Sequence, residues 1–311
     1  MNMTIKKVII RCHKLDGFSE SWDKTSSVKK PSVSFTCFEA EKADYPESLV
    51  PFHQHPLYQK LDHETKTRIL SAAWIWYNEK TEFLEELIVN PACQLIVTKR
   101  FFGACSNEVR RLISQIMVDE QYHAYMSIYP SIFTREKRDL EGLYFEYPHV
   151  IKRYRDIDNT HNDEGTKNIL LLAFMVVAEL SINGYLNLLS KNEDIQPLNK
   201  EITYNHQKDE ARHSFIVKQV AKDIYINMSE EEKTLFSGFI NEALIAFVKA
   251  EFLPWKIILE FIGVPFAEEL IRFSEEKQNG APLFRDVRVL QGFINELGFG
   301  HRVPYLEKLV G

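Results

Sequence analysis

Two pairs of glutamate and histidine, each pair spaced three residues apart, are the side chains of this sequence best suited to chemistry. They are Glu120 with His123 and Glu210 with His213. Residues three apart lie on the same side of a helix, so each pair would present a carboxylate and an imidazole together. Carboxylates and imidazoles are ligands for iron, manganese and other divalent metals. Two helices that each carry such a pair therefore predict a buried metal site.

The surroundings of the two pairs favour buried positions. Ile113 and Ile116 precede Glu120 on one helical face, so that pair continues an apolar stripe. His206 lies one turn before Glu210 and adds a third imidazole. Taken alone, either pair would also fit a surface salt bridge or a solvated helical face.

A third pair with the same spacing, Glu146 and His149, has Pro148 between its members. The residue before a proline avoids helical backbone angles, so these two side chains are not expected to share a helical face. We therefore do not assign this pair to the site.

Glu179 directly follows an apolar run over residues 169–178. A buried carboxylate is costly without a partner, and no lysine or arginine lies within one helical turn of it. A distant arginine or a bound proton would satisfy Glu179. A metal ion would do so as well, and this is the interpretation we prefer.

A fourth carboxylate is expected from the helical segment 62–90. Its candidates are Glu79, Glu82, Glu85 and Glu86. Glu85 shares a helical face with Tyr77 and Ile88, the most apolar of the four environments, so we choose it over Glu86.

The order of these residues fits a four-helix dimetal protein. Such proteins place one glutamate on each of two helices and a Glu-x-x-His pair on each of the other two. Here Glu85, the first pair, Glu179 and the second pair occur once per helical segment. Two divalent cations would cancel the four negative charges, and the absence of thiolates from the set suits iron or manganese.

The elements that position these residues are predicted to be helices. The apolar period becomes helical from Asp62 onward. Long helices are expected over 62–90 (with a boundary or kink at Pro91), 106–129, 166–190, 198–224 and 229–261. Shorter helices are expected over 265–276 and 284–297, on either side of an Asn279-Gly280 turn. We predict an all-α helical bundle forming a single domain, 1–311, in which 1–60 is irregular with short extended segments at 8–10 and 33–35, 62–225 is the metal-binding bundle and 229–311 adds packing helices.

Composition excludes several classes of function. The net charge of −6 and the pI near 6.0 argue against binding to nucleic acid. The longest apolar run is too short for the roughly 20 residues of a membrane span, so no membrane association is expected. Four cysteines without a Cys-x-x-Cys motif indicate free thiols in a reducing compartment, which predicts a cytoplasmic protein.

At this point the sequence resembles a known family, the ferritin-like di-iron N-oxygenases typified by p-aminobenzoate N-oxygenase. Four features carry the resemblance: WYNEKTEFLEELIVNPAC (76–93), DEQYH (119–123), Glu179, and H-x-x-x-E-x-x-H (206–213). The resemblance implies seven protein ligands, with His206 as the additional histidine beyond the six of the general ferritin-like pattern. The implied ligands are Glu85, Glu120, His123, Glu179, His206, Glu210 and His213.

The resemblance also implies a reaction. Two iron ions, or manganese, would use O2 as co-substrate to oxidise an amine nitrogen to a hydroxylamine, nitroso or nitro product. No flavin or nicotinamide motif is present, so a separate reductase or small redox carrier is expected to supply electrons. Family habit suggests a homodimer.

The substrate is less well defined by the sequence. Tyr77 and Lys80 are weak candidates for binding it, and Arg285 and Arg288 are rival partners for a substrate carboxylate. An arylamine and an amino-acid-derived amine, free or attached to a carrier protein, both remain open. Hydroxylation or desaturation of carbon at the same site is the alternative reaction, and an iron-storage or ferroxidase protein is the less favoured alternative function.

Overall fold

The computed structural model describes residues 15, 17–30, 38–277 and 286–310. Within these ranges the secondary structure is helical, apart from one isolated bridge between Ala43 and Ile195. The prediction of an all-α fold is therefore confirmed. The expected extended segments at 8–10 and 33–35 and the Asn279-Gly280 turn lie outside the described residues.

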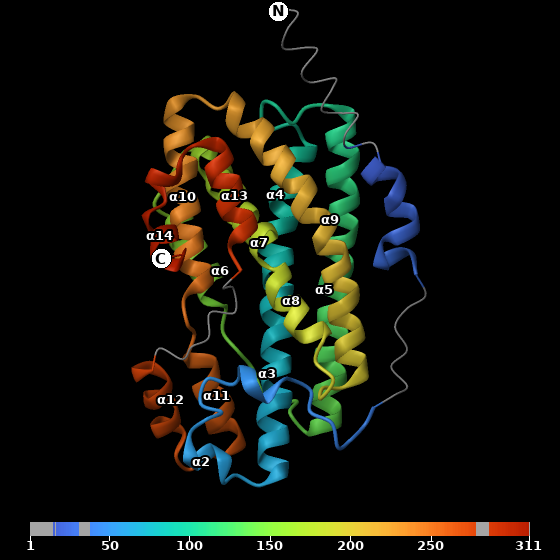
Figure 1. Cartoon of the computed structure of the whole chain (residues 1–311), viewed down its shortest axis with the longest axis vertical. Helices are drawn as coiled ribbons and strands as arrows, with labels where there is room; N and C mark the ends of the chain where they lie inside the picture. The colour runs from blue at the N-terminus through green and yellow to red at the C-terminus, as the bar shows by residue number, and fades with distance from the viewer. Residues whose placement is uncertain (1–14, 16, 31–37, 278–285, 311) are drawn as a thin grey trace, which may run out of the picture.

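Four helical stretches form the part of the bundle that carries the candidate ligands (Figure 1). They are α3 (His63–Leu84), which continues through a π-helical turn, η3 (Glu85–Val89), into α4 (Asn90–Val97); α5 (Asn107–Arg138); α7 (Glu164–Ser181); and α9 (Pro197–Asn227). Side-chain caps begin three of them. Asp62 accepts a hydrogen bond from the Thr65 amide at 2.8 Å, as expected for the predicted helix start. Ser106 and Asp163 cap α5 and α7 in the same way.

The predicted boundary at Pro91 is a change of helical winding and not an end. Proline has no N–H, so it cannot donate the hydrogen bond that a regular helix requires at that position. The chain widens into the π-turn η3 just before Pro91 and then resumes as α4. The first residue of this π-turn is Glu85. Turns of this kind are frequent at functional sites.

Two of the long helices were predicted as single elements and are in fact divided. The segment 166–190 breaks at Ile182 into α7 and α8 (Asn183–Ser190), beside Gly184, a poor helix former. The segment 229–261 divides into α10 (Glu230–Val248) and α11 (Leu253–Ile262). Pro254 explains the second break, because proline is tolerated in the first turn of a helix and not in its interior.

The N-terminal segment is less irregular than predicted. Residues 17–25 are helical, and they are followed by η1 (Ser27–Lys29), η2 (Glu47–Leu49) and α2 (Pro56–Gln59). The remaining elements are α6 (His149–Asp158), α12 (Ala267–Glu276), α13 (Arg288–Leu297), η4 (Gly300–Arg302) and α14 (Pro304–Val310). Figure 1 shows α10, α13 and α14 packed at one end of the molecule and α2, α11 and α12 at the other.

Helix α7 lies at the centre of the larger hydrophobic core. Every residue from Ile169 to Ser181 is buried, and the helix contacts α4, α9, α10 and α13. The stretch 164–190 is long and apolar enough to cross a membrane by length and composition alone, but 83% of its apolar window is buried inside the protein. This is the pattern of a core helix in a soluble protein, and it places Glu179 where water cannot solvate it.

Candidate dimetal site

Two groups of buried side chains in the bundle have the composition and spacing to hold a metal ion. The first group is Glu85, His123, His206 and Glu210, and the second is Glu120, His123, Glu210 and His213. Within each group, one ligand atom per residue lies within 4.8 Å of all the others. The groups share His123 and Glu210, so two ions held by them would be neighbours.

The imidazole nitrogens in these groups point at carboxylate oxygens. His213 Nδ1 lies 2.7 Å from Glu120 Oε1 and 3.3 Å from Glu210 Oε1. His123 Nδ1 lies 2.9 Å from Glu120 Oε2 and 3.3 Å from Glu210 Oε1. His206 Nε2 lies 3.3 Å from the same Glu210 oxygen and 3.8 Å from Glu85 Oε1. Six of the seven predicted side chains thus converge around Glu210.

Glu179 occupies a position next to the two groups and belongs to neither. It lines a small cavity of about 20 Å³ together with Glu85 and Glu210, and its carboxylate is buried. One of its oxygens, Oε2, has no hydrogen-bond partner. The structure therefore brings Glu179 to the cavity that the other carboxylates share, without placing it in ligand distance of the rest.

Glu86, the rival of Glu85, lies outside the cluster. Its carboxylate accepts a hydrogen bond from Gln121 Nε2 at 2.7 Å on the protein surface. Glu79 is paired with Arg135 instead. The third pair, Glu146 and His149, is also elsewhere, with Glu146 bonded to Lys152.

Without a metal, the cluster is electrostatically frustrated. Burial raises the pKa of Glu179 well above its usual range, and the nearby carboxylates of Glu210 and Glu120 raise it further. Burial and the same two neighbours also raise the pKa of Glu85. Burial favours the neutral form of His213, but Glu120 and Glu210 outweigh it and raise the pKa of this imidazole. The site therefore retains protons in place of other cations.

The donor set fits a pair of divalent metal ions. Seven buried atoms in the cluster have no hydrogen-bond partner among the described residues: Glu85 Oε2, Glu120 Oε1, Glu179 Oε2, His206 Nε2, both Glu210 oxygens and His213 Nδ1. Unsatisfied buried polar atoms are rare and costly. That they gather in one place, on carboxylates and imidazoles alone, indicates a metal centre.

Two further carboxylates hold the histidines in place, and our interpretation of the sequence did not assign them a role. Asp119 accepts from His213 Nε2 at 3.0 Å, and Asp209 lies 3.3 Å from His123 Nε2. Each aspartate thus supports the histidine of the other helix. Their signal in the sequence was a repeated Asp-Glu-x-x-His, since each aspartate directly precedes a ligand glutamate.

The N-terminal helix docks on these same aspartates. Asp119 also accepts hydrogen bonds from Trp22 Nε1 at 2.9 Å and from the Ser26 hydroxyl, and it is paired with Arg212. Asp209 accepts from the backbone amide of Ser27 at 3.1 Å. The segment before α2 therefore closes the outer side of the site.

We expect Asp119→Asn to weaken metal binding about 10- to 100-fold, the usual effect of removing a carboxylate behind a histidine ligand. The amide cannot hold the His213 ring as the carboxylate does, and it leaves Arg212 without its buried counter-charge. Metal affinity measured with a competing chelator tests this expectation. Asp139→Asn, at the exposed end of the same helix, is the control and should bind metal as the unmodified protein does. Equal affinity in both variants would contradict the assignment.

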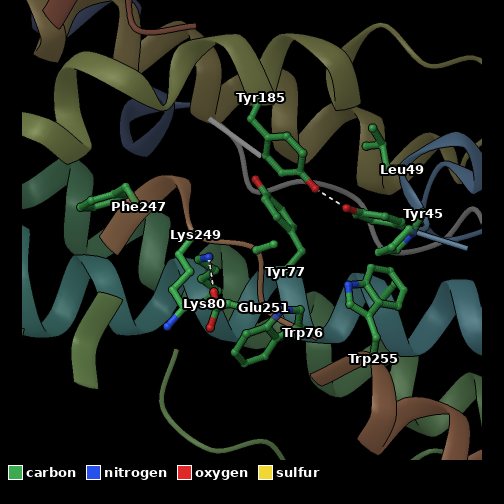
Figure 2. Close-up of a pocket in the computed structure, with 13 residues that line it drawn as sticks. Tyr45, Leu49, Trp76, Tyr77, Lys80, Tyr185, Phe247, Lys249, Glu251 and Trp255 are labelled. Atoms are coloured by element: carbon green, nitrogen blue, oxygen red, sulfur yellow. Dashed lines mark hydrogen bonds and ion pairs between the residues drawn. The ribbon is translucent and has the colours of Figure 1, made fainter. Parts of the chain in front are cut away.

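Tyr77 and Lys80 line a separate pocket next to the cluster (Figure 2). Tyr77 is buried and stacks with Trp74 and Tyr185, and Lys80 Nζ is 2.6 Å from Glu251 Oε1. Arg288 is exposed and paired with Asp286 on the surface, so it does not face this pocket. Arg285 lies outside the described residues.

Comparison with known proteins agrees with this geometry. The model of the family "p-aminobenzoate N-oxygenase AurF" matches residues 13–298, nearly the whole chain. The chain belongs to this family. A 4-aminobenzoate N-oxygenase from Streptomyces thioluteus is 30% identical to it over 264 residues, which cover 84% of this chain and 78% of that protein. The matched region of the N-oxygenase family includes every element that contributes to the cluster.

Proposed function

We propose that this protein is an O2-dependent oxygenase that oxidises the nitrogen of an arylamine. The observation that carries the proposal is the buried cluster of carboxylates and three imidazoles, with its unsatisfied oxygens and nitrogens, in a chain of the N-oxygenase family. The similar protein from Streptomyces is named for 4-aminobenzoate, which suggests an aromatic amine as the substrate class.

We infer that the seven side chains hold two iron ions, with Glu210 between them. Glu85, Glu120 and Glu179 complete the carboxylates, and the three histidines complete the set. Manganese has the same ligand preferences and is the alternative metal. When bound, the metal pair supplies the electrons and the open coordination positions needed to activate O2.

The protein's own residues perform three tasks in this proposal. Asp119 and Asp209 orient His213 and His123, so that each ring presents Nδ1 to the interior. Apolar residues of α7 exclude water from the cluster. His206 adds a neutral donor on the Glu85 side, which would change the charge of that half of the site relative to a six-ligand centre.

Oxidation of an added amine tests the function directly. Iron-loaded protein is mixed with an electron donor, O2 and a panel of aromatic and aliphatic amines, and products are identified by mass spectrometry. We expect an arylamine to gain oxygen on nitrogen. Oxygen on carbon only would favour the hydroxylase alternative, and iron uptake without any oxidised product would favour storage.

We expect the electrons to come from a separate reductase or redox carrier in the cytoplasm, since the sequence carries no flavin or nicotinamide motif. The acidic balance of the chain gives no reason to expect nucleic acid or membrane partners.

A second copy of the chain is the partner that the outer face of α5 suits best. The exposed residues of this face are Ser114, Val118, Gln121, Tyr125, Ile128, Tyr129 and Ile132. None is charged over about 27 Å of helix, in a chain with 26% charged residues. Tyrosine enrichment and charge depletion are typical of interface centres, and an uncharged face is complementary to itself. We propose a homodimer through α5.

The double substitution Val118→Glu and Tyr125→Glu should convert the dimer to monomers, because it places like charges opposite one another across the two-fold axis. Light scattering after size-exclusion chromatography measures the mass. Glu136→Lys, exposed on the same helix beyond this face, is the control and should remain dimeric. A double variant that still dimerises would place the interface elsewhere.

A further inference from the structure

Three cavities follow one another from the metal cluster to the surface. The innermost is the cavity of Glu85, Glu179 and Glu210, which is also lined by Phe247. Phe247 lines a second cavity as well, which we call the tyrosine pocket because Tyr45, Tyr77 and Tyr185 contribute to it. The third, the outer pocket, has a volume of about 200 Å³.

The tyrosine pocket and the outer pocket are contiguous. They share four lining residues: Trp76, Lys249, Ala250 and Glu251. The last three belong to the linker between α10 and α11, where the helix predicted from the sequence is interrupted. Aromatic side chains form much of the walls of both pockets, namely Trp76, Tyr77, Tyr185 and Trp255 in the first and Phe145 and Tyr147 in the second. An aromatic molecule with one end at the cluster would therefore extend toward this linker.

The charge of Lys80 in the tyrosine pocket is already neutralised. Its ammonium lies 2.6 Å from Glu251 Oε1, and both side chains are largely buried. The other Glu251 oxygen accepts from the His149 amide at 2.6 Å. Burial disfavours ionised Glu251, but Lys80 outweighs it and holds the pKa of this carboxyl below its usual value. Lys80 and Glu251 thus form an internal ion pair with no net charge for a ligand.

Lys249 is different. It lies where the two pockets meet and is exposed, and no carboxylate of the described residues is within 4.0 Å of its ammonium. Figure 2 shows its side chain beside the Lys80–Glu251 pair, with the ammonium pointing away from the tyrosines. The other lysine of the outer pocket, Lys152, is paired with Glu146. The uncompensated positive charge along this route is therefore that of Lys249.

We propose that Lys249 binds an anionic group at the end of the substrate opposite to the reacting amine, and so selects arylamines that carry a carboxylate. This rests on the proposed function and deepens it. Phe247 and Lys249 lie two residues apart at the end of α10, so one short segment contacts both the inner and the outer part of the route. A carrier-bound thioester lacks a carboxylate, so this site favours the free acid as substrate.

Replacing Lys249 with glutamine tests the proposal by binding and by turnover. The probes are 4-aminobenzoate and its neutral counterpart 4-aminobenzamide. A charge-assisted hydrogen bond contributes enough to change affinity about 10- to 100-fold. We therefore expect Lys249→Gln to weaken calorimetric binding of 4-aminobenzoate, and to raise its KM, by this factor. Binding of the amide and kcat for both amines should change little.

Lys152→Gln is the matched control, because this lysine lies in the outer pocket and is already paired. It should bind both probes as the unmodified protein does. Equal weakening of the acid and the amide by Lys249→Gln, or no weakening of either, would overturn the proposal. Calorimetry separates this failure from failure of the proposed function, since 4-aminobenzoate bound through Lys249 and left unoxidised would refute only the reaction.

Discussion

Replacing Glu210 with glutamine should leave the protein with fewer than one metal ion per chain and lower N-oxygenation more than about 100-fold. Glu210 belongs to both groups of ligand atoms, and three imidazole nitrogens lie 3.3 Å from its Oε1. A neutral amide cannot replace a carboxylate between two cations. Since even the residues behind the ligands are worth about 10- to 100-fold, loss of this central ligand should cost more.

Glu86→Gln is the matched control for this experiment. Glu86 neighbours a proposed ligand in the sequence, but it lies on the surface, bonded to Gln121. Its substitution should leave two metal ions per chain, measured by plasma emission spectrometry on protein expressed in iron-rich medium. A Glu210→Gln protein with the same metal content as Glu86→Gln would contradict the central position of Glu210.

Removing the metal should destabilise the protein substantially at neutral pH. A ligand that binds only the folded state contributes about 4 kcal/mol when its concentration is 1,000 times its Kd. For a chain of this size we therefore expect the Tm of chelator-treated protein to fall by roughly 10 °C. Scanning calorimetry before and after chelation measures the difference, and re-addition of iron(II) should restore the original Tm.

The pH dependence of the metal-free protein follows from its raised pKa values. The pKa values of Glu85 and Glu179 are raised above 4.5 in the folded state, so their unfolded forms lose protons first and stability falls as pH rises above about 4.5. His123 and His213 have pKa values raised above 6.5. Their stabilisation is complete below pH 6.5 and is lost as pH rises through the folded values.

Two groups act in the opposite direction but do not reverse the trend. Histidine–carboxylate contacts lower the pKa of Glu120 to about 2 despite its burial, so its contribution is lost only in acid. Burial lowers the pKa of His206, which adds some stability as pH rises through 6.5. We expect the metal-free protein to become less stable from pH 5 to 8, and the metal-loaded protein to do so much less, since metal competes with protons for these ligands. Parallel curves for the two forms would argue against metal at this site.

The sequence contained most of what positions the cluster. Glu120, His123, Glu210 and His213 were predicted from spacing and apolar stripes, because a helix fixes the angular relation of residues three and four apart. Asp62 and Ser229 predicted helix starts through local capping, and both caps form in the structure. These features depend on a few neighbouring residues, which is why they could be inferred from one chain.

Features that depend on distant segments were missed. The π-turn that contains Glu85 and the breaks at Ile182 and before Pro254 are compromises between helical winding and packing. The ion pair of Lys80 joins α3 to the linker after α10, 171 residues away, so Lys80 could not be recognised as neutralised. The crossed support of His213 by Asp119 likewise requires α5 and α9 to be adjacent.

Anomalous diffraction from crystals of the iron-loaded protein, measured on both sides of the iron absorption edge, tests the central claim most directly. The account predicts two iron peaks about 3.5–4 Å apart, as in other two-metal sites, inside the cluster of Glu85, Glu120, His123, Glu179, His206, Glu210 and His213. A single peak, or two peaks that leave Glu179 or His206 without a bond to metal, would contradict it.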